Sequence, residues 1–472
     1  MTVRAEPKSA GSSRVVLIAG VAALGGFLFG FDSSVINGGV NAIRDEFDIG
    51  SALIGFVVSI ALLGSAVGAW FAGPLADRYG RIRVMLVAAA VFLVSAIGAG
   101  LPFAVWDLMF WRLVGGFAIG AASVIAPTYI AEVAPARLRG RLGSLQQLAI
   151  VFGIFVALLS DYALATAAGG SASDELWWGL EAWQWMFLVG VIPAAAYGLL
   201  ALTIPESPRW LIARGRNDEA RTILAEIDDG EVTVDERLRQ IQSSVDTEVQ
   251  PKLSDLRGPR FGLLPVVWVG ILLSVFQQFV GINVIFYYSS TLWQAVGFTE
   301  NDALLTGVLN STVNIVATFI AIALIDRVGR KPLLLVGSAG MFVSLGTLTF
   351  VFATATTNSA GDPVITGATS TIALIAANAF VFFFAFSWGP VVWVLLGEMF
   401  PNRIRAAALS VAAAAQWMAN FIISSSFPWL ASRSLGIAYG IYTTFALLSF
   451  FFVMSKIKET KGRTLEDLSS AQ

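Results

Sequence analysis

Hydrophobic residues along the chain gather into apolar runs of roughly 20 residues, separated by short polar or charged stretches. A helix needs a run of this length to cross the ~30 Å hydrocarbon core of a bilayer. The runs predict spans at residues 15–38, 52–75, 83–102, 106–131, 142–162, 184–204, 262–293, 303–325, 332–354, 371–396, 406–428 and 435–455. The pattern therefore indicates an all-α membrane protein with twelve transmembrane helices.

A hydrophilic segment divides these spans into two sets of six. We expect an N-terminal tail (1–14), an N-terminal six-helix bundle (15–204), a cytoplasmic helical linker (205–260), a C-terminal six-helix bundle (261–455) and a C-terminal tail (456–472). The first tail is polar, and the apolar run after it continues past any small-residue cleavage site. This favours a retained first helix over a signal peptide.

Basic residues concentrate in the loops on one side of the expected membrane, between spans 2 and 3, 4 and 5, 8 and 9, and 10 and 11. The opposite loops hold mostly acids. Because lysine and arginine favour the cytoplasmic side, both termini and the linker should be cytoplasmic. The sequence thus predicts a multi-pass protein of the cell inner (cytoplasmic) membrane.

The composition limits the chemistry available to the chain. Charged residues make up 13% of it, against about 25% in soluble proteins, and a net charge of −2 gives no reason to expect nucleic acid as a partner. Cysteine and histidine are both absent, so a proton handled near neutral pH must ride on a carboxylate. No phosphate loop of the GxxxxGK[ST] kind is present, which excludes ATP hydrolysis as the energy source. We expect no metal and no cofactor.

Two charged motifs occur once in each half of the chain. Asp77, Arg78 and Arg81 after span 2 recur as Asp326, Arg327 and Arg330 after span 8, and Glu132 and Arg139 after span 4 recur as Glu398 and Arg405 after span 10. The preference of basic residues for cytoplasmic loops alone is an alternative that explains the arginines, but it leaves the acids at fixed offsets unexplained. The repeats indicate a duplicated bundle, as in some secondary transporters.

Several sequence motifs resemble one family. The segments GGFLFGFDSSVING (25–38), PESPRWL (205–211), QQFVGINVIFYYS (277–289), SWGPVVW (387–393) and ETKGRTLEDL (459–468) are similar to those of the sugar porters of the major facilitator superfamily. The wording is most similar to bacterial hexose–proton symporters of the actinobacterial glucose permease kind. The resemblance implies two pseudo-symmetric six-helix bundles that transport a sugar by alternating access.

Asp32 lies inside span 1 and Arg112 inside span 4. Both fall about 9 Å from the outer end of their spans, given a rise of 1.5 Å per residue. An unpaired charge at mid-bilayer costs about 2.5–3.5 kcal/mol on insertion scales, so we expect the two to pair. The pair could be a static link between helices, or Asp32 could release Arg112 on protonation and so couple protons to the change of state. Symporters that resemble this sequence have Asp at this position.

Small residues follow Arg112 at every fourth position, as Gly116 and Gly120, and Gly64 and Gly68 do likewise on span 2. Such spacing predicts close packing of these helices.

Amide side chains inside the spans are candidates for sugar binding, because each offers both donors and acceptors. They are Gln147, Gln277, Gln278, Asn283, Asn314, Gln416 and Asn420, and by resemblance they match sugar-binding positions of the family. Asn283 would point about 120° away from Gln277 on an unbroken helix, but unwinding at Gly281 could turn these amides to one side. Hydrogen bonding between helices is the alternative role.

Tryptophans flank these amides at positions 388, 393 and 417. We predict that Trp388 stacks on the apolar face of a sugar ring, with Trp417 as a second candidate. Gly389 and Pro390 remove a helix hydrogen bond beside Trp388 and predict a hinge.

The repeated charges Asp77, Arg78, Arg81, Glu132, Arg139, Asp326, Arg327, Arg330, Glu398 and Arg405 should lie at cytoplasmic helix ends. They could be ordinary solvated charges. The resemblance implies that they bridge helices and stabilise the state in which the inner side is closed.

Taken together, these features predict a transporter and not an enzyme, because no nucleophile–base set or metal constellation is present. We expect a proton-coupled symporter that imports a hexose, with D-glucose as the first candidate. Its partners would be a small-molecule sugar, protons as coupling ion and the lipid bilayer, and it would function as a monomer. The alternatives are an uncoupled facilitator, a symporter for xylose, galactose or myo-inositol, and a non-transporting sugar sensor, which the short C-terminal tail disfavours.

Overall fold

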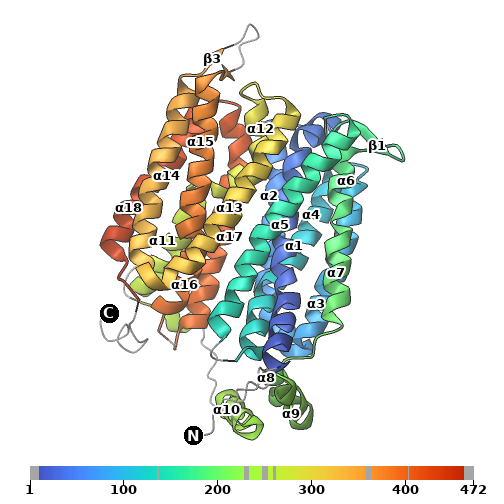
Figure 1. The fold of residues 1–472 in the computed structure, drawn as a ribbon, viewed down its shortest axis with the longest axis vertical. Helices are drawn as coiled ribbons and strands as arrows, with labels where there is room; N and C mark the ends of the chain where they lie inside the picture. Colours follow the sequence, from blue (N-terminus) through green and yellow to red (C-terminus); the bar gives the residue numbers. More distant parts are fainter. Residues whose placement is uncertain are drawn as a thin grey trace, which may run out of the picture.

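The computed structural model describes residues 10–135, 138–227, 233–246, 253–258, 262–357, 363–401 and 403–461. In these ranges twelve helical segments are long and apolar enough to cross a membrane, which confirms the predicted number of spans. Figure 1 shows them as two helical bundles side by side. The predicted fold class is therefore correct.

The N-terminal half contains the first six spans. Its elements are α1 (Ala10–Glu46), α2 (Ser51–Tyr79), α3 (Arg81–Gly100), α4 (Val105–Val133), α5 (Arg139–Ala168), β1 (Glu175–Trp177), β2 (Leu180–Glu181), α6 (Ala182–Val189) and α7 (Val191–Ala201). α6 and α7 together form the sixth span. α1 ends at Glu46, well past the predicted end of its span at residue 38, because the helix continues through polar residues after the apolar run is complete.

The C-terminal half contains the other six spans. Its elements are α11 (Pro265–Phe279), α12 (Ile282–Gln294), α13 (Glu300–Val328), α14 (Arg330–Ala353), β3 (Thr356–Thr357), β4 (Pro363–Val364), α15 (Ala368–Phe383), η2 (Phe384–Trp388), α16 (Gly389–Met399), α17 (Arg405–Ala431) and α18 (Leu435–Lys456).

Two spans of this half are interrupted where the sequence predicts a break. Gly281 has a left-handed backbone (φ 84°) between α11 and α12, a conformation that glycine adopts without steric cost. In the other span, η2 is a π-helical turn immediately before Gly389 and Pro390, and such turns are frequent at functional sites.

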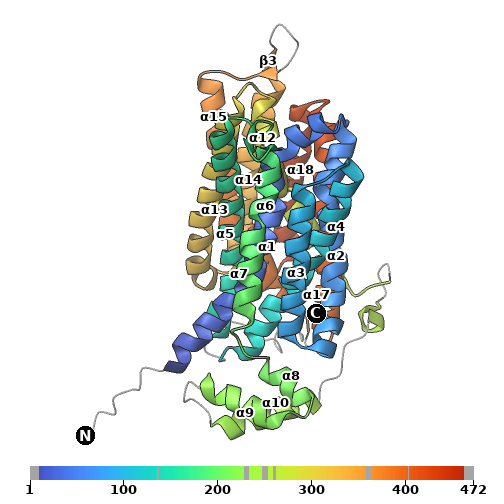
Figure 2. The same ribbon diagram turned by 90° about the vertical axis from the view of Figure 1, so that its right-hand side faces the viewer.

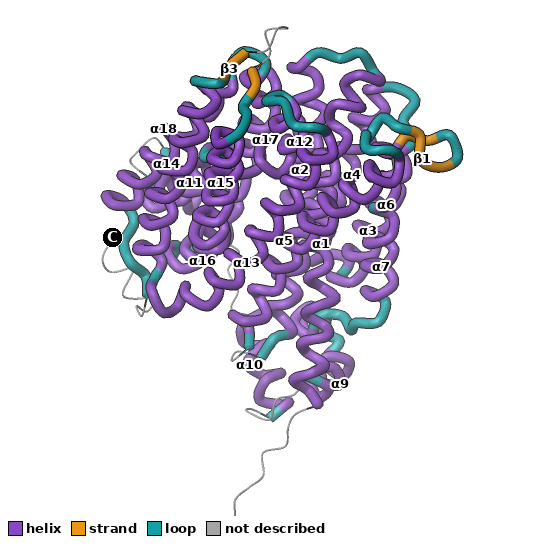
Figure 3. The backbone as a smooth tube through the Cα atoms, turned by 45° about the horizontal axis from the view of Figure 1, so that its top comes forward, coloured by secondary structure: helices purple, strands orange, loops and turns teal. Residues whose placement is uncertain are grey.

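The linker between the halves forms α8 (Pro208–Ala213), α9 (Asn217–Glu226), α10 (Val234–Asp246) and the short 3₁₀ helix η1 (Leu253–Leu256). Helices α8 to α10 lie beyond one end of the bundle (Figure 2), which we call the linker end. The hairpins β1–β2 and β3–β4 lie at the opposite end (Figure 3), which we call the hairpin end.

Glycines allow α2 and α4 to pack backbone to backbone, as their spacing predicts. A Cβ added at Gly116 would meet the carbonyl of Ala61, and one added at Gly68 would meet the carbonyl of Phe117. Such close contact through small residues is typical of helix packing in membranes.

The two halves touch each other at the hairpin end. The Asn37 side chain on α1 donates to Ser289 Oγ on α12 (3.1 Å) and accepts from the backbone N–H of Ser290 (3.1 Å). Thr166 on α5 donates to Asn301 on α13 (2.8 Å). Gly55 on α2 lies against the carbonyl of Ser425 on α17.

Many large apolar side chains remain exposed on the outer faces of the spans. Examples are Phe71, Val87, Ile192, Leu199, Phe350 and Ile375. Exposed apolar surface of this extent marks contact with a partner or a membrane, and here it covers helices of spanning length.

Candidate functional site

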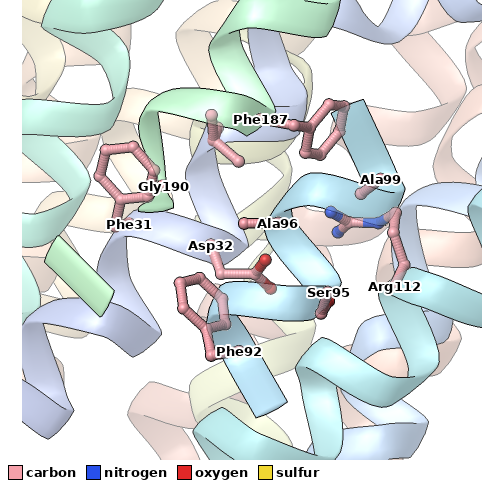
Figure 4. A pocket seen from close by; sticks show the side chains of 10 residues that line it. Phe31, Asp32, Phe92, Ser95, Ala96, Ala99, Arg112, Phe187 and Gly190 are labelled. Carbon is pink, nitrogen blue, oxygen red and sulfur yellow. The ribbon is translucent and has the colours of Figure 1, made fainter. Parts of the chain in front are cut away.

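Asp32 on α1 and Arg112 on α4 lie together inside the N-terminal half. Their relative exposures are 7% and 2%, so both are shielded from lipid and solvent. Figure 4 shows both residues lining one cavity, with the Phe187 ring beside the guanidinium. The ring centroid lies 5.7 Å from the guanidinium carbon, close enough for a cation–π contact.

The predicted direct ion pair between Asp32 and Arg112 is wrong for this conformation, since no ion pair within 4.0 Å joins them among the described residues. Arg112 instead donates from Nε to the carbonyl of Val57 (3.2 Å) and from Nη2 to that of Val58 (3.1 Å). The cause is the close contact of α4 with α2. Arg112 lies one turn before Gly116, and the two carbonyls lie one turn before Ala61, which Gly116 touches.

Each charged group keeps one polar atom without a partner in the described structure, namely Asp32 Oδ2 and Arg112 Nη1. Both residues line two cavities of about 10 Å³ each, about the smallest space that can hold one water molecule. The second cavity also touches Tyr287 of the C-terminal half.

The amides of span 7 form a chain of hydrogen bonds. Asn283 Nδ2 donates to Gln278 Oε1 (2.6 Å), and Gln278 Nε2 donates to Gln277 Oε1 (3.4 Å). Gln277 Nε2 donates to the carbonyl of Trp388 (2.9 Å). The break at Gly281 brings Asn283 back against Gln278, an arrangement that the sequence analysis considered possible.

Span 11 supplies amides next to Tyr287. Asn420 donates to the Tyr287 hydroxyl (3.5 Å) and accepts from Ser424 (3.1 Å). Gln416, one turn earlier, has a buried Oε1 without a partner in the described structure. Asn314 on α13 is buried and Gln147 on α5 is half-buried.

The sequence analysis missed Tyr287, which connects the amides to the Asp32 cavity. It also missed Asn37, Ser289 and Ser290 at the contact between the halves. The available signal was position: Tyr287, Ser289 and Ser290 follow Asn283 directly on α12.

The stacking role predicted for Trp388 is wrong for this conformation. Its side chain is fully buried, and its Nε1 donates to the carbonyl of Leu334 (3.2 Å) and to Ser338 Oγ (3.0 Å) on α14. A buried indole N–H requires a partner, and η2 places this one against α14, so neither ring face is open. Trp393, on the next turn, is 42% exposed. Trp417 packs edge-on against Phe29 of the other half, with centroids 5.3 Å apart.

The repeated charges form matching clusters at the linker end. In the N-terminal half Arg81 pairs with Glu132 (2.8 Å) and Asp77 (3.1 Å). In the C-terminal half Arg330 pairs with Glu398 (2.7 Å) and Asp326 (3.1 Å). The described ion pairs of these clusters each join helices of one half.

A third acid completes each cluster, and the sequence analysis missed both of these acids. Glu206 accepts from the backbone N–H of Arg81 (2.9 Å), and Glu459 accepts from that of Arg330 (3.1 Å). Each belongs to a motif that follows the sixth span of its half, which was the usable signal. Partial burial raises the pKa of Glu459, but four backbone N–H donors outweigh it, so the pKa lies below its ordinary value.

The contacts of the remaining predicted charges are hydrogen bonds that involve backbone carbonyls. The carbonyl of Arg78 accepts from Arg214 (2.8 Å), that of Arg327 accepts from Lys461 (2.5 Å), and Arg405 donates to the carbonyl of Phe400 (3.2 Å). Arg139 begins α5, but its side chain lies outside the described part of the structure. No group of three or more acidic residues in the described ranges could hold a metal ion.

Twelve spans in two halves, with buried polar side chains where the halves approach each other, define a multi-pass membrane transporter. The family model described as "Sugar (and other) transporter" matches residues 18–471. The chain therefore belongs to the sugar transporter family, and to the sugar porters of the major facilitator superfamily within it.

Relatives and solved structures agree with this assignment. The chain is 58% identical to a glucose transport protein of Synechocystis, over 96% of this chain and 97% of that one. It is 36% identical to the D-xylose-proton symporter of Escherichia coli, over 97% and 96%. An inward open structure of the xylose transporter XylE from E. coli is 34% identical, with a TM-score of 0.81 over 97% of this chain and 99% of that one.

Proposed function

We propose that the protein is a proton-coupled symporter that imports a hexose, with D-glucose as its first substrate. The observation that carries the proposal is the buried Asp32, which faces Arg112 without pairing to it and shares a cavity with Tyr287 of the amide-bearing half. The names of the relatives support both parts, since one is a glucose transport protein and others are symporters of xylose or arabinose with protons.

The conformation supports a place in an alternating-access cycle. The halves are bonded at the hairpin end through Asn37 and Thr166, and the inward open XylE structure superposes well on the chain. We infer that the hairpin end faces outward and is closed here, and that the linker end, with both termini, faces the cytoplasm. The protein would work as a monomer in the inner membrane.

Asp32 would carry the proton. When it is protonated, Arg112 stays bonded to the carbonyls of Val57 and Val58, the arrangement present here. When it is ionised, the carboxylate attracts the guanidinium across the small cavities, so the contact between α1, α2 and α4 changes. Protonation thereby biases which end of the bundle is open.

The sugar would bind between the halves, mainly to the C-terminal amides. Gln277, Gln278 and Asn283 present alternating donors and acceptors, as a ring of hydroxyl groups requires. Gln416 Oε1 has no partner among the described residues, and Trp417 packs against Phe29 of the other half, so the contacts of both residues would change when the halves move relative to each other.

Transport in proteoliposomes tests the proposal. An imposed proton gradient should concentrate glucose, and Asp32→Asn should abolish this accumulation while leaving sugar exchange largely intact. An Asn variant that still accumulates sugar would show that Asp32 does not couple, and a wild type that never accumulates it would make the protein an uncoupled facilitator. Xylose, galactose and myo-inositol as competitors in the same vesicles define the substrate.

A further inference from the structure

A second acid lies fully buried inside a span of the N-terminal half. Asp161 on α5 has no exposed surface, and the coupling mechanism above does not use it. One carboxylate oxygen, Oδ2, accepts from the backbone N–H of Gly38 on α1 (3.2 Å). The other oxygen, Oδ1, has no partner among the described residues.

Tight packing of α1, α5 and α6 encloses this carboxyl group. A Cβ at Gly38 would lie 2.9 Å from Asp161 Cγ and 2.5 Å from Met186 Sδ. Glycine at position 38 is thus what allows the N–H of α1 to reach the acid. In this conformation Oδ1 is buried as well.

Asp161 also lies beside the contact between the halves. Gly38 directly follows Asn37, whose side chain bonds to Ser289 and Ser290. On α5, Leu158 lies one turn before Asp161 and approaches Gly307 of α13, and Thr166 lies beyond it and bonds to Asn301 of α13. The opposite half therefore covers α5 on both sides of Asp161.

No ion pair to this acid is present among the described residues. The charged and titratable groups on the elements packed around it include Asp32, Arg44, Asp45 and Glu46 on α1, Tyr162 on α5, Glu181 before α6, and Glu300 and Asp302 on α13. None of them bonds to Asp161 within the described structure; Arg44 pairs with Asp45 (2.9 Å), and Glu300 accepts from the N–H of Ala172 (2.8 Å). A carboxylate sealed from water without a cation is far costlier than the neutral acid.

We infer that Asp161 is a second proton-binding site, tied to the contact between the halves at the hairpin end. A proton from the solvent bonds to Oδ1 when this end closes, while Oδ2 keeps the N–H of Gly38. The proton returns to the solvent when α13 separates from α5 and water reaches the group. The inference rests on the proposed alternating access, and it adds a proton-dependent closure of the hairpin end that is separate from Asp32.

Linkage gives the direction of the effect. Because closure takes up a proton at Asp161, lowering the pH must favour the closed hairpin end. A neutral amide at position 161 can still accept from Gly38 but cannot take up a proton. Asp161→Asn should therefore keep the hairpin end closed at every pH.

Spin-label distances measure this directly, without sugar or transport. The chain has no cysteine, so Ser173→Cys and Thr366→Cys, at exposed positions of the hairpin end in opposite halves, provide the only labels. Asp32→Asn is included in all samples to remove the first acid. Between about pH 8 and about pH 5 we expect the ratio of short to long distances to rise about fivefold or more, the low end of coupling between linked sites.

Adding Asp161→Asn should abolish this pH dependence and leave the short distance dominant throughout. The matched control is Asp107→Asn, because Asp107 is a buried acid of the same half whose hydrogen bond in the described structure comes from the N–H of Phe103 (3.3 Å); the pH dependence should survive it. A pH dependence that persists in Asp161→Asn, or that is absent while Asp161 is present, would overturn the inference.

Infrared difference spectra supply a second measurement if Asp161→Asn does not fold. In the Asp32→Asn protein, the protonated-carboxyl band that appears on acidification should shift in Asp161→Glu. An unshifted band would equally overturn the inference. If the proposed function is wrong, the transport assay will show it, because the Asp32→Asn protein will still accumulate sugar. That outcome would not change the spin-label distances, so the two failures can be distinguished.

Discussion

At the scale of single residues, Arg112 is held more firmly than Asp32. The guanidinium is fixed by two carbonyls of α2 and by the face of Phe187, whereas Asp32 Oδ2 has no described partner. In this conformation the arginine therefore has partners of its own that do not depend on the acid. The carboxyl group is the member of the pair that can change state without dismantling its surroundings.

The amide chain of span 7 gives a prediction at this scale. Gln278→Ala or Asn283→Ala should weaken sugar binding by ~1–3 kcal/mol, because each removes a buried hydrogen-bonding group. Isothermal titration calorimetry on purified protein measures the change. Asn378→Ala is the matched control, since the hydrogen bond that Asn378 donates in the described structure goes to the carbonyl of Leu374 within its own helix (2.9 Å). Unchanged affinity in both span 7 variants would place the sugar elsewhere.

The outcome for particular residues shows what a sequence can and cannot predict. The common depth of Asp32 and Arg112 follows from helical rise along two spans, so it could be predicted from the sequence. The hydrogen-bond partners of Arg112 could not be predicted, because they lie on a third helix, α2, that packs closely against Gly116. The stacking role predicted for Trp388 was wrong for a related reason. The π-helical turn of η2 rotates the indole toward α14, and no local sequence pattern specifies that rotation.

At the scale of elements, a glutamate that follows the last span of each half in the sequence caps the start of another helix of that half. Glu206 accepts from the N–H groups of Arg81 and Ile82 at the start of α3, and Glu459 from those of Arg330 and Lys331 at the start of α14. An anion at a helix N-terminus satisfies free N–H groups and the helix dipole. The caps thus fasten the chain after each half back onto that half.

Glu459→Gln should lower the stability of the protein by about 1 kcal/mol near neutral pH, the usual value of such a cap. Because the folded state lowers the pKa of Glu459, its contribution is complete above the ordinary carboxyl pKa and is lost as the pH falls through the lowered one. The difference from wild type should therefore shrink below about pH 4. Thermal unfolding in detergent at both pH values measures it.

The control for this variant is Glu226→Gln, which breaks the exposed pair of Glu226 with Arg14. Exposed pairs contribute little, so this change should have a small effect at any pH. An equal loss of stability at neutral and acidic pH in Glu459→Gln would show that shape, and not charge, makes the cap.

The break in span 7 gives another prediction about an element. Gly281→Ala should lower both stability and sugar affinity, since a left-handed backbone costs an L-residue about 1–2 kcal/mol and the new Cβ would lie 2.7 Å from the Tyr442 ring. Gly397→Ala is the matched control, because Gly397 has open space around it on α16. Unfolding and calorimetry on both variants decide; full affinity in Gly281→Ala would mean that the break does not orient Asn283.

Elements were the most predictable part of the molecule. The twelve spans depend on apolar length, and the break at Gly281 on glycine itself, and both are local properties of the chain. Helix ends were harder to predict, because α1 continues into polar sequence beyond the end of its apolar run. The caps by Glu206 and Glu459 join residues more than a hundred positions apart, so spacing alone could not reveal them.

At the scale of the whole molecule, hydrogen bonds join the two halves at the hairpin end. At the linker end, the ion pairs of each charge cluster lie within one half. The conformation therefore depends on a small number of contacts between otherwise self-contained bundles. Changing one of these contacts should shift the equilibrium between conformations without unfolding either half.

Asn37 is the residue at which this expectation is most specific, because its side chain makes two 3.1 Å hydrogen bonds to the opposite half. Asn37→Ala removes both. At about 0.5–1.5 kcal/mol for each bond, the ratio of open to closed hairpin ends should rise by roughly 5-fold to 150-fold, visible as longer distances between labels at positions 173 and 366. Asn41→Ala, which loses one bond of 3.4 Å from Thr291, should change the ratio far less. Equal effects of the two variants would mean that apolar packing, such as Gly55 against α17, closes this end.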